Sequence, residues 1–323
     1  MFKRNFIKKF AFLAVFSFCL PISYVQAKVI TSVKPIGFIT AALTDGVTET
    51  QILLPDGASP HTYSLKPSDL VKLKSADLII WIGDDMETFL PGLLRSIDSS
   101  KQLELADDAK VKALLRAGHS HEHEDEDEDE DEDEHDHGHD HGHDHAAHDH
   151  HHGEFDMHIW LSPKIAAVTA QIIHDKLVAI YPDKAAKIDQ NLNVFLKQLK
   201  ETEQIIAKKL NNVQNKGYFV FHDAYGYFES EFKLNNLGSF TINPAIQPGV
   251  KKVSEIQNEL NNKHAVCVFR EPQFSPAIIN KLVDGTDVKV GELDPLGMDV
   301  EISKDAYCKF LLKLTQQYLN CLE

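Results

Sequence analysis

Residues 183–213 read DKAAKIDQNLNVFLKQLKETEQIIAKKLNNV, a stretch whose apolar residues recur at helical spacing and which contains neither Gly nor Pro. Because no helix breaker interrupts the pattern, it predicts a single helix over residues 183–212. At ~1.5 Å per residue such a helix is about 45 Å long, which is enough to cross a whole domain. The sequence on either side should therefore form two units that this helix connects.

Short apolar strands alternate with helical patterns before that helix. The strand patterns are KVITSVKPI (28–36), TQILLP (50–55) and DLIIWIG (77–83), and KPSDLVKLKSA (66–76) predicts a short helix with Ser68 as its N-cap. Ser162 followed by Pro163 marks the start of another helix, which Tyr181-Pro182 ends. Such alternation favours parallel strands with helical crossovers, so residues 28–182 are predicted to form one α/β lobe.

The same alternation returns after the long helix. The strand patterns are YFVFHD (218–223), LGSFTI (237–242), AVCVFRE (265–271) and VKVGELD (288–294), and the helical patterns are KKVSEIQNELNN (251–262) and SPAIINKLVDG (275–285). Residues 213–323 are therefore predicted to form a second α/β lobe. The expected fold class is α/β, with two lobes joined by a long helix.

The N-terminus has the pattern of a secretory signal peptide. Residues 1–27 carry four basic residues and no acidic one, then an apolar core, then Val25-Gln26-Ala27. The apolar core is too short to span a bilayer, and no later segment is long enough either. A lipoprotein cleavage site needs a small residue before its cysteine, whereas Phe18 precedes Cys19, so lipid anchoring is not expected. We expect cleavage after Ala27 and an exported, periplasmic protein with no transmembrane segment after cleavage.

Residues 119–152 read HSHEHEDEDEDEDEDEHDHGHDHGHDHAAHDHHH and interrupt the first lobe. The stretch holds 16 acidic residues and no Lys or Arg, which accounts for the whole net charge of −16. The rest of the chain is nearly neutral, so neither nucleic acid nor a membrane surface is expected as a partner. With no hydrophobic residue larger than Ala, the stretch should be a disordered surface loop when no metal is bound.

Histidines in this stretch form many overlapping ligand sets for divalent metal. The auxiliary candidates are His119, His121, His123, His135, His137, His139, His141, His143, His145, His148, His150, His151 and His152. Because a flexible chain loses entropy on binding, these sets should bind zinc more weakly than a preorganised site. The loop would then collect zinc or sense it. The alternative is a solubilising insert whose metal affinity is incidental.

Three cysteines remain after signal cleavage. Cys308 and Cys321 lie on one predicted terminal helix, about 20 Å apart at ~1.5 Å per residue, so they cannot bridge each other. In an oxidising compartment one disulfide and one free thiol are expected. Cys267 would then pair with one of the two, and Cys321 is favoured because it lies near the chain end. Three unpaired thiols are the alternative.

Polar residues at the ends of predicted strands are the candidate site residues, because functional groups gather beyond the carboxyl ends of parallel strands. His61 follows the strand near residue 54, His222 ends YFVFHD, and Asp294 ends VGELD. His158 stands between Met157 and Ile159, whose apolar side chains favour a fixed position. Each residue has a plainer interpretation: a lone buried histidine is usually a core residue, and an Asp before a Pro is often a turn former.

Convergence favours the metal interpretation. Both lobes supply imidazole near a loop whose composition suits divalent metal, and three histidines with one open or oxygen-filled position form a tetrahedral zinc site. His174 and His264 lack this context and are expected at the surface. A secreted zinc hydrolase is the rival class, with Asp294 as its base. The HExxH pattern is absent, however, as are a nucleophile elbow, a P-loop and a dinucleotide fingerprint.

Seven stretches, together with the His-rich insertion, closely resemble the periplasmic zinc-binding receptors of ZnuA type. They are LLPDGASPHTYSLKPSDL, ADLIIWIG, MHIWLSP, GYFVFHDAYGYFE, NPAIQPG, EPQFSPA and LDPLG. The resemblance runs from about Lys28 to the C-terminus. It implies two four-stranded parallel α/β lobes, a rigid connecting helix, zinc held in the interlobe cleft by His61, His158 and His222, and a Cys267–Cys321 disulfide.

One position departs from the family pattern. Some members of that family carry a glutamate immediately before the first ligand histidine, whereas this chain has Pro60. A fourth zinc ligand would then be water or Asp294. Cys308 is also additional to the pattern.

The resemblance also implies a function of capture and delivery. A monomeric receptor, which is not an enzyme, would bind Zn²⁺ and dock on an inner-membrane zinc ABC permease with its ATPase. Zinc affinity should fall as the pH drops through about 6.5, because histidine binds metal only when deprotonated. A stiff connecting helix should limit the change on binding to local loops.

Overall fold

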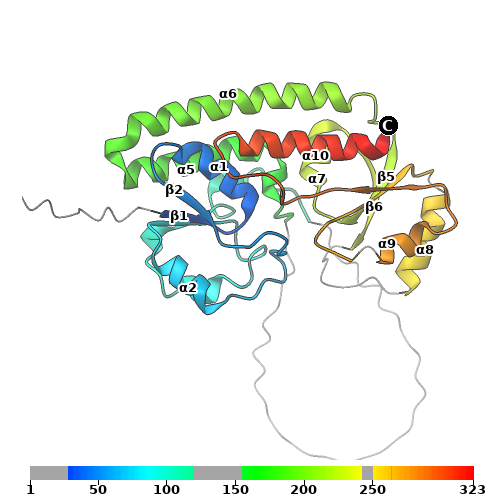
Figure 1. Cartoon of the computed structure of the whole chain (residues 1–323), viewed down its shortest axis with the longest axis horizontal. Helices are drawn as coiled ribbons and strands as arrows, with labels where there is room; N and C mark the ends of the chain where they lie inside the picture. Colours follow the sequence, from blue (N-terminus) through cyan, green and yellow to red (C-terminus); the bar gives the residue numbers. More distant parts are fainter. Residues whose placement is uncertain (1–27, 119–154, 242–249, 263, 276) are drawn as a thin grey trace, which may run out of the picture.

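The computed structural model describes residues 28–118, 155–241, 250–262, 264–275 and 277–323. The predicted signal peptide and the His-rich stretch 119–152 lie outside these residues. Two four-stranded parallel sheets, with strand orders β2-β1-β3-β4 and β6-β5-β7-β8, form the centres of two lobes. Helices flank both sheets, and the long helix α6 runs over both lobes (Figure 1). The predicted fold class is confirmed.

The elements follow one another in simple alternation. In the first lobe they are β1 (Lys28–Thr31), α1 (Lys34–Thr44), β2 (Glu49–Ile52), α2 (Pro67–Lys74), β3 (Leu78–Trp81), α3 (Pro91–Leu94), β4 (Gln102–Glu104), α4 (Ala109–Lys112) and α5 (Pro163–Ile180). Then come α6 (Ala185–Leu210), β5 (Gly217–His222), α7 (Gly226–Phe232), β6 (Asn235–Thr241), α8 (Val250–Asn262), β7 (Cys267–Arg270), α9 (Ala277–Val283), β8 (Lys289–Glu292) and α10 (Ala306–Leu322). Short 3-10 turns span Ser99–Lys101, Ile159–Leu161 and Pro182–Lys184.

Central strands are buried on both faces, as the apolar runs predict for parallel sheets covered by helices. All four residues of β3 and all six of β5 are buried. The strand β3 lies between β1 and β4, and β5 lies between β6 and β7. Because the strands are parallel, their carboxyl ends meet at one edge of each sheet.

The helix α6 joins the lobes through a stripe of buried side chains at three- and four-residue spacing. They are Ile188, Asn191, Phe195, Leu199, Thr202, Ile206 and Leu210. Its 26 residues correspond to about 39 Å at ~1.5 Å per residue. The terminal helix α10 packs against α6, against α1 of the first lobe and against β8 of the second (Figure 1). Two helices rather than one therefore connect the lobes, which favours a stiff connection.

No helix among the described residues has the length and apolar composition needed to cross a membrane.

Three local predictions were wrong in detail. The strand predicted over 28–36 ends at Thr31, because Pro35 fits the first turn of a helix and the apolar run continues as α1. The N-cap of α2 is Lys66 rather than Ser68, with Pro67 in the first turn and the Asp69 carboxylate accepting the Lys66 N–H. The connecting helix begins at Ala185, after a 3-10 turn at Pro182–Lys184.

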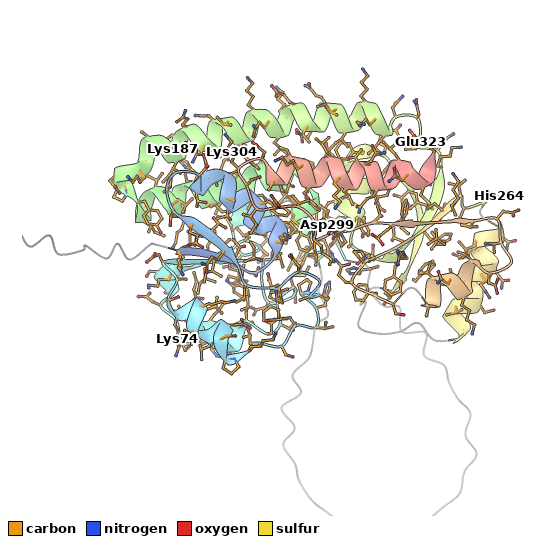
Figure 2. All side chains as sticks on the ribbon, viewed as in Figure 1. Lys74, Lys187, His264, Asp299, Lys304 and Glu323 are labelled. Carbon is orange, nitrogen blue, oxygen red and sulfur yellow. A yellow bond between two sulfur atoms is a disulfide. The ribbon has the colours of Figure 1, made fainter. Side chains whose placement is uncertain are left out.

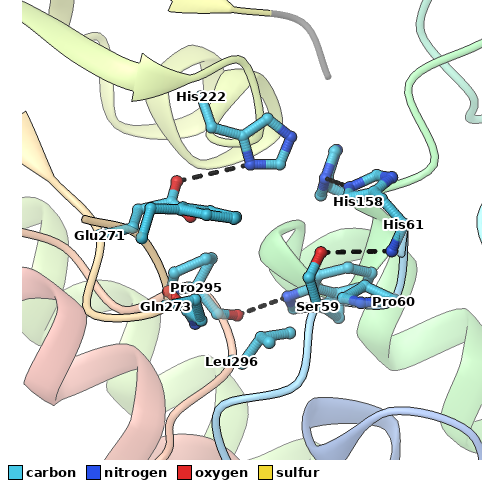
Figure 3. Close-up of a pocket in the computed structure, with 11 residues that line it drawn as sticks. Ser59, Pro60, His61, His158, His222, Glu271, Gln273, Pro295 and Leu296 are labelled. Carbon is cyan, nitrogen blue, oxygen red and sulfur yellow. Dashed lines mark hydrogen bonds and ion pairs between the residues drawn. The ribbon is translucent and has the colours of Figure 1, made fainter. Parts of the chain in front are cut away.

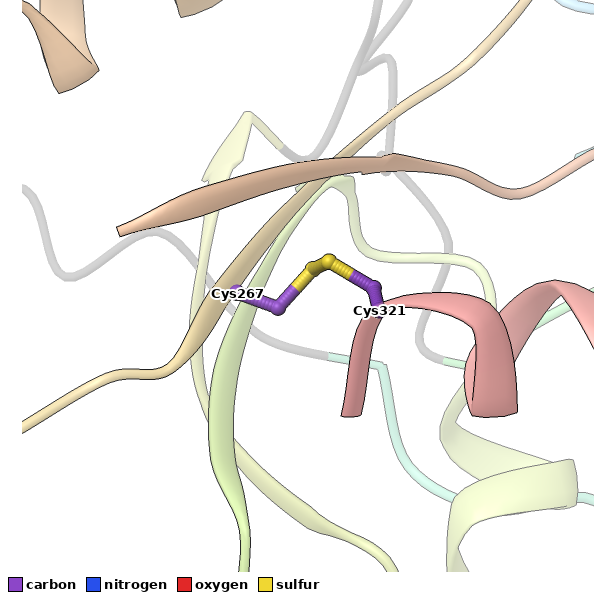
Figure 4. Close-up of a disulfide and its surroundings, with 2 residues drawn as sticks. All are labelled: Cys267 and Cys321. Carbon is purple, nitrogen blue, oxygen red and sulfur yellow. A yellow bond between two sulfur atoms is a disulfide. The ribbon is translucent and has the colours of Figure 1, made fainter. Parts of the chain in front are cut away.

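The disulfide implied by the resemblance is present between Cys267 and Cys321, whose Cα atoms are 6.0 Å apart (Figure 4). It ties the last turn of α10 to the first residue of β7. Cys308 is free and half-buried on α10, as expected for the third thiol.

Removing this disulfide should lower the free energy of unfolding substantially. The two cysteines are 54 residues apart, and closing a loop of that length stabilises a fold by up to about 4 kcal/mol. We expect a loss approaching this value for the Cys267→Ser/Cys321→Ser variant in urea unfolding of the metal-free protein. Cys308→Ser is the matched control and should lose about 1 kcal/mol or less. Equal losses in the two variants would contradict the prediction.

His174 on α5 is less exposed than predicted, because it lies between two carboxylates. Its Nδ1 is 2.9 Å from an Asp175 oxygen, and its Nε2 is 2.7 Å from an Asp189 oxygen on α6. Partial burial opposes the charged imidazole, but the hydrogen bonds to Asp175 and Asp189 raise the pKa of His174 above 6.5. The bridge between α5 and α6 therefore strengthens when His174 is protonated.

This bridge predicts a pH-dependent stability. Because the folded pKa exceeds the unfolded one, the contribution is complete below about pH 6.5 and is lost as the pH rises through the folded pKa. The stability difference between wild type and His174→Gln should be larger near pH 6 than near pH 8.5. The two aspartates are 70% and 59% exposed, so the change should not exceed about 1 kcal/mol. Urea unfolding of metal-free protein measures it, and a difference that grows with pH would contradict it.

Candidate metal centre

Three histidines from separate segments converge on one cavity between the lobes (Figure 3). His61 follows β2 in the first lobe, His158 precedes the 3-10 turn before α5, and His222 is the last residue of β5. Their candidate ligand atoms all lie within 4.8 Å of one another. The cavity holds about 20 Å³, enough for one metal ion or one water molecule. Its other lining residues include Ser59, Pro60, Trp160, Glu271, Gln273, Phe274, Pro295 and Leu296.

The distance between two of the imidazoles matches zinc geometry. The Nε2 atoms of His61 and His158 are 3.3 Å apart. Ligand nitrogens at ~2.0–2.1 Å from a tetrahedral zinc ion lie about 3.4 Å from each other. The ring centroids of His222 lie 5.1 Å from His61 and 4.8 Å from His158, which places the third ring against the same point. The three side chains therefore surround one point, with one nitrogen–nitrogen distance already at the zinc value and the group as a whole within 4.8 Å.

An aspartate two residues earlier orients His158. The Asp156 carboxylate lies 2.8 Å from Nδ1 of His158 and accepts a 3.0 Å hydrogen bond from its backbone N–H. A proton on Nδ1 leaves the Nε2 lone pair directed at the cavity, which is the tautomer that a metal needs. The Trp160 ring packs edge-on against His158, and its indole N–H donates to the Pro295 carbonyl of the second lobe.

His222 is buried at the carboxyl end of β5, with a side chain 3% exposed. Neither ring nitrogen has a hydrogen-bond partner among the residues that the structure describes. A Glu271 oxygen lies 3.4 Å from Nδ1, and that carboxylate accepts a hydrogen bond from the Tyr225 hydroxyl. A buried imidazole with two unsatisfied nitrogens is unfavourable unless something binds it.

Sequence reasoning missed Glu271 and Asp156 as site residues. Glu271 stands directly after β7, one position beyond the strand, whereas His222 is the last residue of β5. That signal was present in AVCVFRE, but a charged residue at a strand end is also common on protein surfaces. Asp156 could not be distinguished from the acidic residues before it, because it follows a stretch in which nearly half of the residues are acidic.

His61 is held in a neutral form. Burial, and then the neighbouring rings of His222 and His158, keep the pKa of His61 well below its ordinary value. A neutral imidazole is the form that binds metal. The buried Pro60 before it lines the cavity at the position where the resemblance implies a glutamate in other members.

Asp294 has a different environment from the three histidines. Its carboxylate accepts hydrogen bonds from the backbone N–H groups of Leu296, Gly297 and Met298, at 3.0, 3.0 and 2.6 Å. Burial raises the pKa of Asp294, while these N–H groups oppose the rise. Within the described part of the chain, Asp294 is not in the group of converging ligand atoms. The geometry favours the turn-forming role that sequence analysis left open.

The remaining histidine predictions fall elsewhere. His264 is exposed with φ +52°, as predicted for a surface residue. The auxiliary histidines of 119–152 lie outside the described residues, so they stay a prediction.

Known proteins resemble this chain over almost its full length. The model of the family described as zinc-uptake complex component A, periplasmic (ZnuA) matches residues 29–321. The high-affinity zinc uptake system protein ZnuA of Yersinia pestis is 47% identical over 321 residues, which cover 99% of each chain. The corresponding protein of Haemophilus ducreyi is 50% identical over 297 residues, covering 92% of this chain and 94% of the relative.

Solved structures share the fold at lower identity. A crystal structure of ZnuA is 20% identical, with a TM-score of 0.72, and covers 92% of this chain and 100% of that one. The periplasmic zinc-binding protein TroA from Treponema pallidum is 17% identical, with a TM-score of 0.73, over 92% and 99%. These two likenesses concern the fold alone. The family match and the two sequence relatives show that this chain belongs to the ZnuA family, the periplasmic component A of zinc-uptake complexes.

Proposed function

We propose that this protein is a periplasmic receptor that binds Zn²⁺ and passes it to an importer. The observation that supports this most directly is the group of His61, His158 and His222, whose ligand atoms lie within 4.8 Å of one another. Imidazole is the preferred ligand of zinc and its borderline neighbours, whereas calcium, magnesium and manganese favour oxygen. Family membership agrees with zinc as the cargo.

In the proposed complex, three neutral imidazoles hold zinc and a water molecule fills the fourth position. The Asp156 carboxylate fixes His158 through Nδ1, and Glu271 lies where it can accept the Nδ1 proton of His222. Both carboxylates would raise the basicity of their imidazole and fix its orientation. The Glu271 carboxyl group also belongs to the buried lining of the cavity. The carboxylate of Asp294 would stabilise the adjoining turn.

Delivery completes the proposed function. The relatives are named as parts of a zinc uptake system, which fits an inner-membrane ABC permease and its ATPase as partners. The leader of residues 1–27, cut after Ala27, would place the monomeric receptor in the periplasm. The proposed parts of the mature chain are a first lobe (28–182), a connecting helix (183–212) and a second lobe (213–323). The packing of α10 on both lobes favours binding that orders loops rather than rotates lobes.

Zinc content and affinity test the proposal. Protein purified without a metal-affinity column, stripped with a chelator and titrated with zinc should bind one ion tightly at the cleft. The triple variant His61→Ala/His158→Ala/His222→Ala should lose that tight site and keep the fold. A triple variant that still binds zinc with wild-type affinity would contradict the assignment. A zinc-loaded protein that turned over ester or peptide substrates would instead favour the hydrolase class.

The His-rich stretch is proposed as an auxiliary zinc collector or sensor. Deleting residues 119–152 should remove several weak sites and leave one tight site in calorimetry, because overlapping ligand sets on a flexible chain bind less tightly than a preorganised cleft. A scrambled stretch with each His replaced by Asn is the matched control for length and charge. If tight binding disappeared with the stretch, the cleft assignment would fail.

A further inference from the structure

Lys34 occupies an unusual place for a cation. It is the first residue of α1, two residues after the turn out of β1 begins at Ser32, and the partial positive charge of the helix N-terminus disfavours a basic side chain there. Its side chain is nevertheless only 14% exposed. The ammonium nitrogen donates to the Asp56 carboxylate at 2.7 Å and to the Met298 carbonyl at 2.5 Å. These two partners hold a charge in a position that the helix itself does not favour.

The two acceptors belong to different lobes, and both adjoin the metal centre. Asp56 lies on the loop that leads from β2 to His61. Met298 ends the turn whose N–H groups the Asp294 carboxylate holds. A second small cavity lies between this loop and this turn, and Leu296 lines both it and the metal cavity. Lys34 therefore ties the loop of one ligand to the opposite lobe.

His61 is the histidine that most needs such a restraint. His158 is oriented by Asp156, and His222 is fixed at the end of a buried strand. In the described part of the chain, the ring of His61 contacts only the other two histidines through hydrogen bonds or ring packing. The position of its ring therefore depends on the loop that carries it.

We propose that Lys34, Asp56 and the Met298 carbonyl form a clasp that positions His61 and thereby sets how long zinc stays bound. This inference rests on the proposed zinc-binding function. With the clasp closed, the loop holds the His61 Nε2 near that of His158. With the clasp open, the loop moves away from the second lobe and zinc loses one ligand. A permease that separates Lys34 from Met298 would then release zinc without unfolding either lobe.

The test compares Lys34→Met, which keeps the length but not the charge, with Lys34→Arg, which keeps the charge. We expect zinc to dissociate about tenfold faster from Lys34→Met, because a hydrogen bond to a charged group is lost, and the affinity to fall by a similar factor. Lys34→Arg should recover most of the loss. Asp56→Asn, at a side chain 64% exposed, should give a smaller change in the same direction without risk to the fold.

Lys187→Met is the matched control. Lys187 also pairs with an aspartate, Asp45 at 3.7 Å. It lies at one end of the molecule, far from the clasp. The labelled Asp299, the residue after Met298, marks the place of the clasp between the lobes (Figure 2). Zinc dissociation should be unchanged in this variant. Dissociation from Lys34→Met within twofold of the wild type would overturn the proposal, as would equal acceleration in Lys187→Met.

A double-mutant cycle separates positioning from general stabilisation. If Lys34 acts through His61, Lys34→Met should have no further effect on zinc affinity in a His61→Ala background. A full tenfold effect in that background would show that the clasp does not act through His61 and would overturn the proposal. Wild-type protein that failed to bind zinc at all would refute the proposed function instead, which keeps the two failures distinct.

Discussion

His222→Ala should weaken zinc binding by more than about a hundredfold, because residues that merely orient a ligand already account for 10- to 100-fold in affinity. His222 is buried at the end of β5, its ring centroid lies 4.8 Å from that of His158, and it is one of the three described residues whose ligand atoms converge. Competition with a chromophoric zinc chelator measures the change. Zinc should also stabilise the variant less, since a ligand at about 100 times its Kd adds about 2.7 kcal/mol.

The stability of the metal-free variant distinguishes a ligand from a core residue. Both nitrogens of His222 lack a hydrogen-bond partner in the described residues, so its imidazole adds little to the metal-free fold beyond packing. Metal-free His222→Ala should therefore unfold close to the wild-type midpoint, with the loss confined to the zinc-bound state. The zinc affinity of Glu271→Gln should fall between those of the wild type and His222→Ala. His264→Ala, at an exposed histidine, is the control. A His222→Ala protein that bound zinc normally but was strongly destabilised without metal would contradict the ligand assignment.

The sequence predicted the fold well because its signals are local. Buried strands such as LIIW and GYFVFH are continuous apolar runs, and the long helix contains no breaker, so each could be recognised without tertiary contacts. The error at α1 has the opposite cause. KVITSVKPI reads as one β-rich run in which Pro35 is a weak local signal for a helix start, and the packing of residues 34–44 against α5, α6 and α10, which favours the helix, is not recorded in the sequence.

The site was predictable only in part, for a geometric reason. His61 and His222 could be found at strand ends, and parallel topology brings such ends together. Glu271 and Lys34 contact segments that are far apart in the chain, at about 3 Å, and nothing in their local sequence records those distances. Asp156 stands only two residues before His158, but its contact with the imidazole depends on the local backbone conformation, which the sequence does not show. Strand ends and apolar neighbours identified the three candidate histidines, and the resemblance assigned them to zinc, whereas the carboxylates beside His158 and His222 became visible only in three dimensions.

Asp294→Ala is expected to destabilise the metal-free protein by about 3–5 kcal/mol. The Asp294 carboxylate is buried and accepts three backbone N–H groups of the turn that follows it. Removing this acceptor leaves these donors unpaired, and each unsatisfied buried donor costs about 1–3 kcal/mol before water enters. Asp294→Asn keeps one acceptor oxygen and should lose less. Urea unfolding in the presence of a chelator measures both variants.

The same two variants decide between the roles proposed for Asp294. If Asp294 forms the turn, its substitution should lower the stability of the metal-free protein. The substitution should then lower zinc affinity only through the Met298 carbonyl and the Lys34 clasp. Zinc affinity of Asp294→Asn should then fall by about the same factor as that of Lys34→Met, and combining the two changes should add little more, because both open one restraint. A direct ligand would show the reverse pattern, with unchanged metal-free stability and an affinity loss as large as that of His222→Ala. The Asp294 oxygens already accept hydrogen bonds from the turn, so moving one of them to zinc would break contacts that hold Gly297 at φ +64°. The turn has no spare room there, because a Cβ added to Gly297 would lie 2.9 Å from Phe38 and Phe310. The turn is tightly packed at that point, so a shift of Asp294 towards the cavity would displace the junction between the lobes, whereas a water molecule in the fourth position displaces nothing.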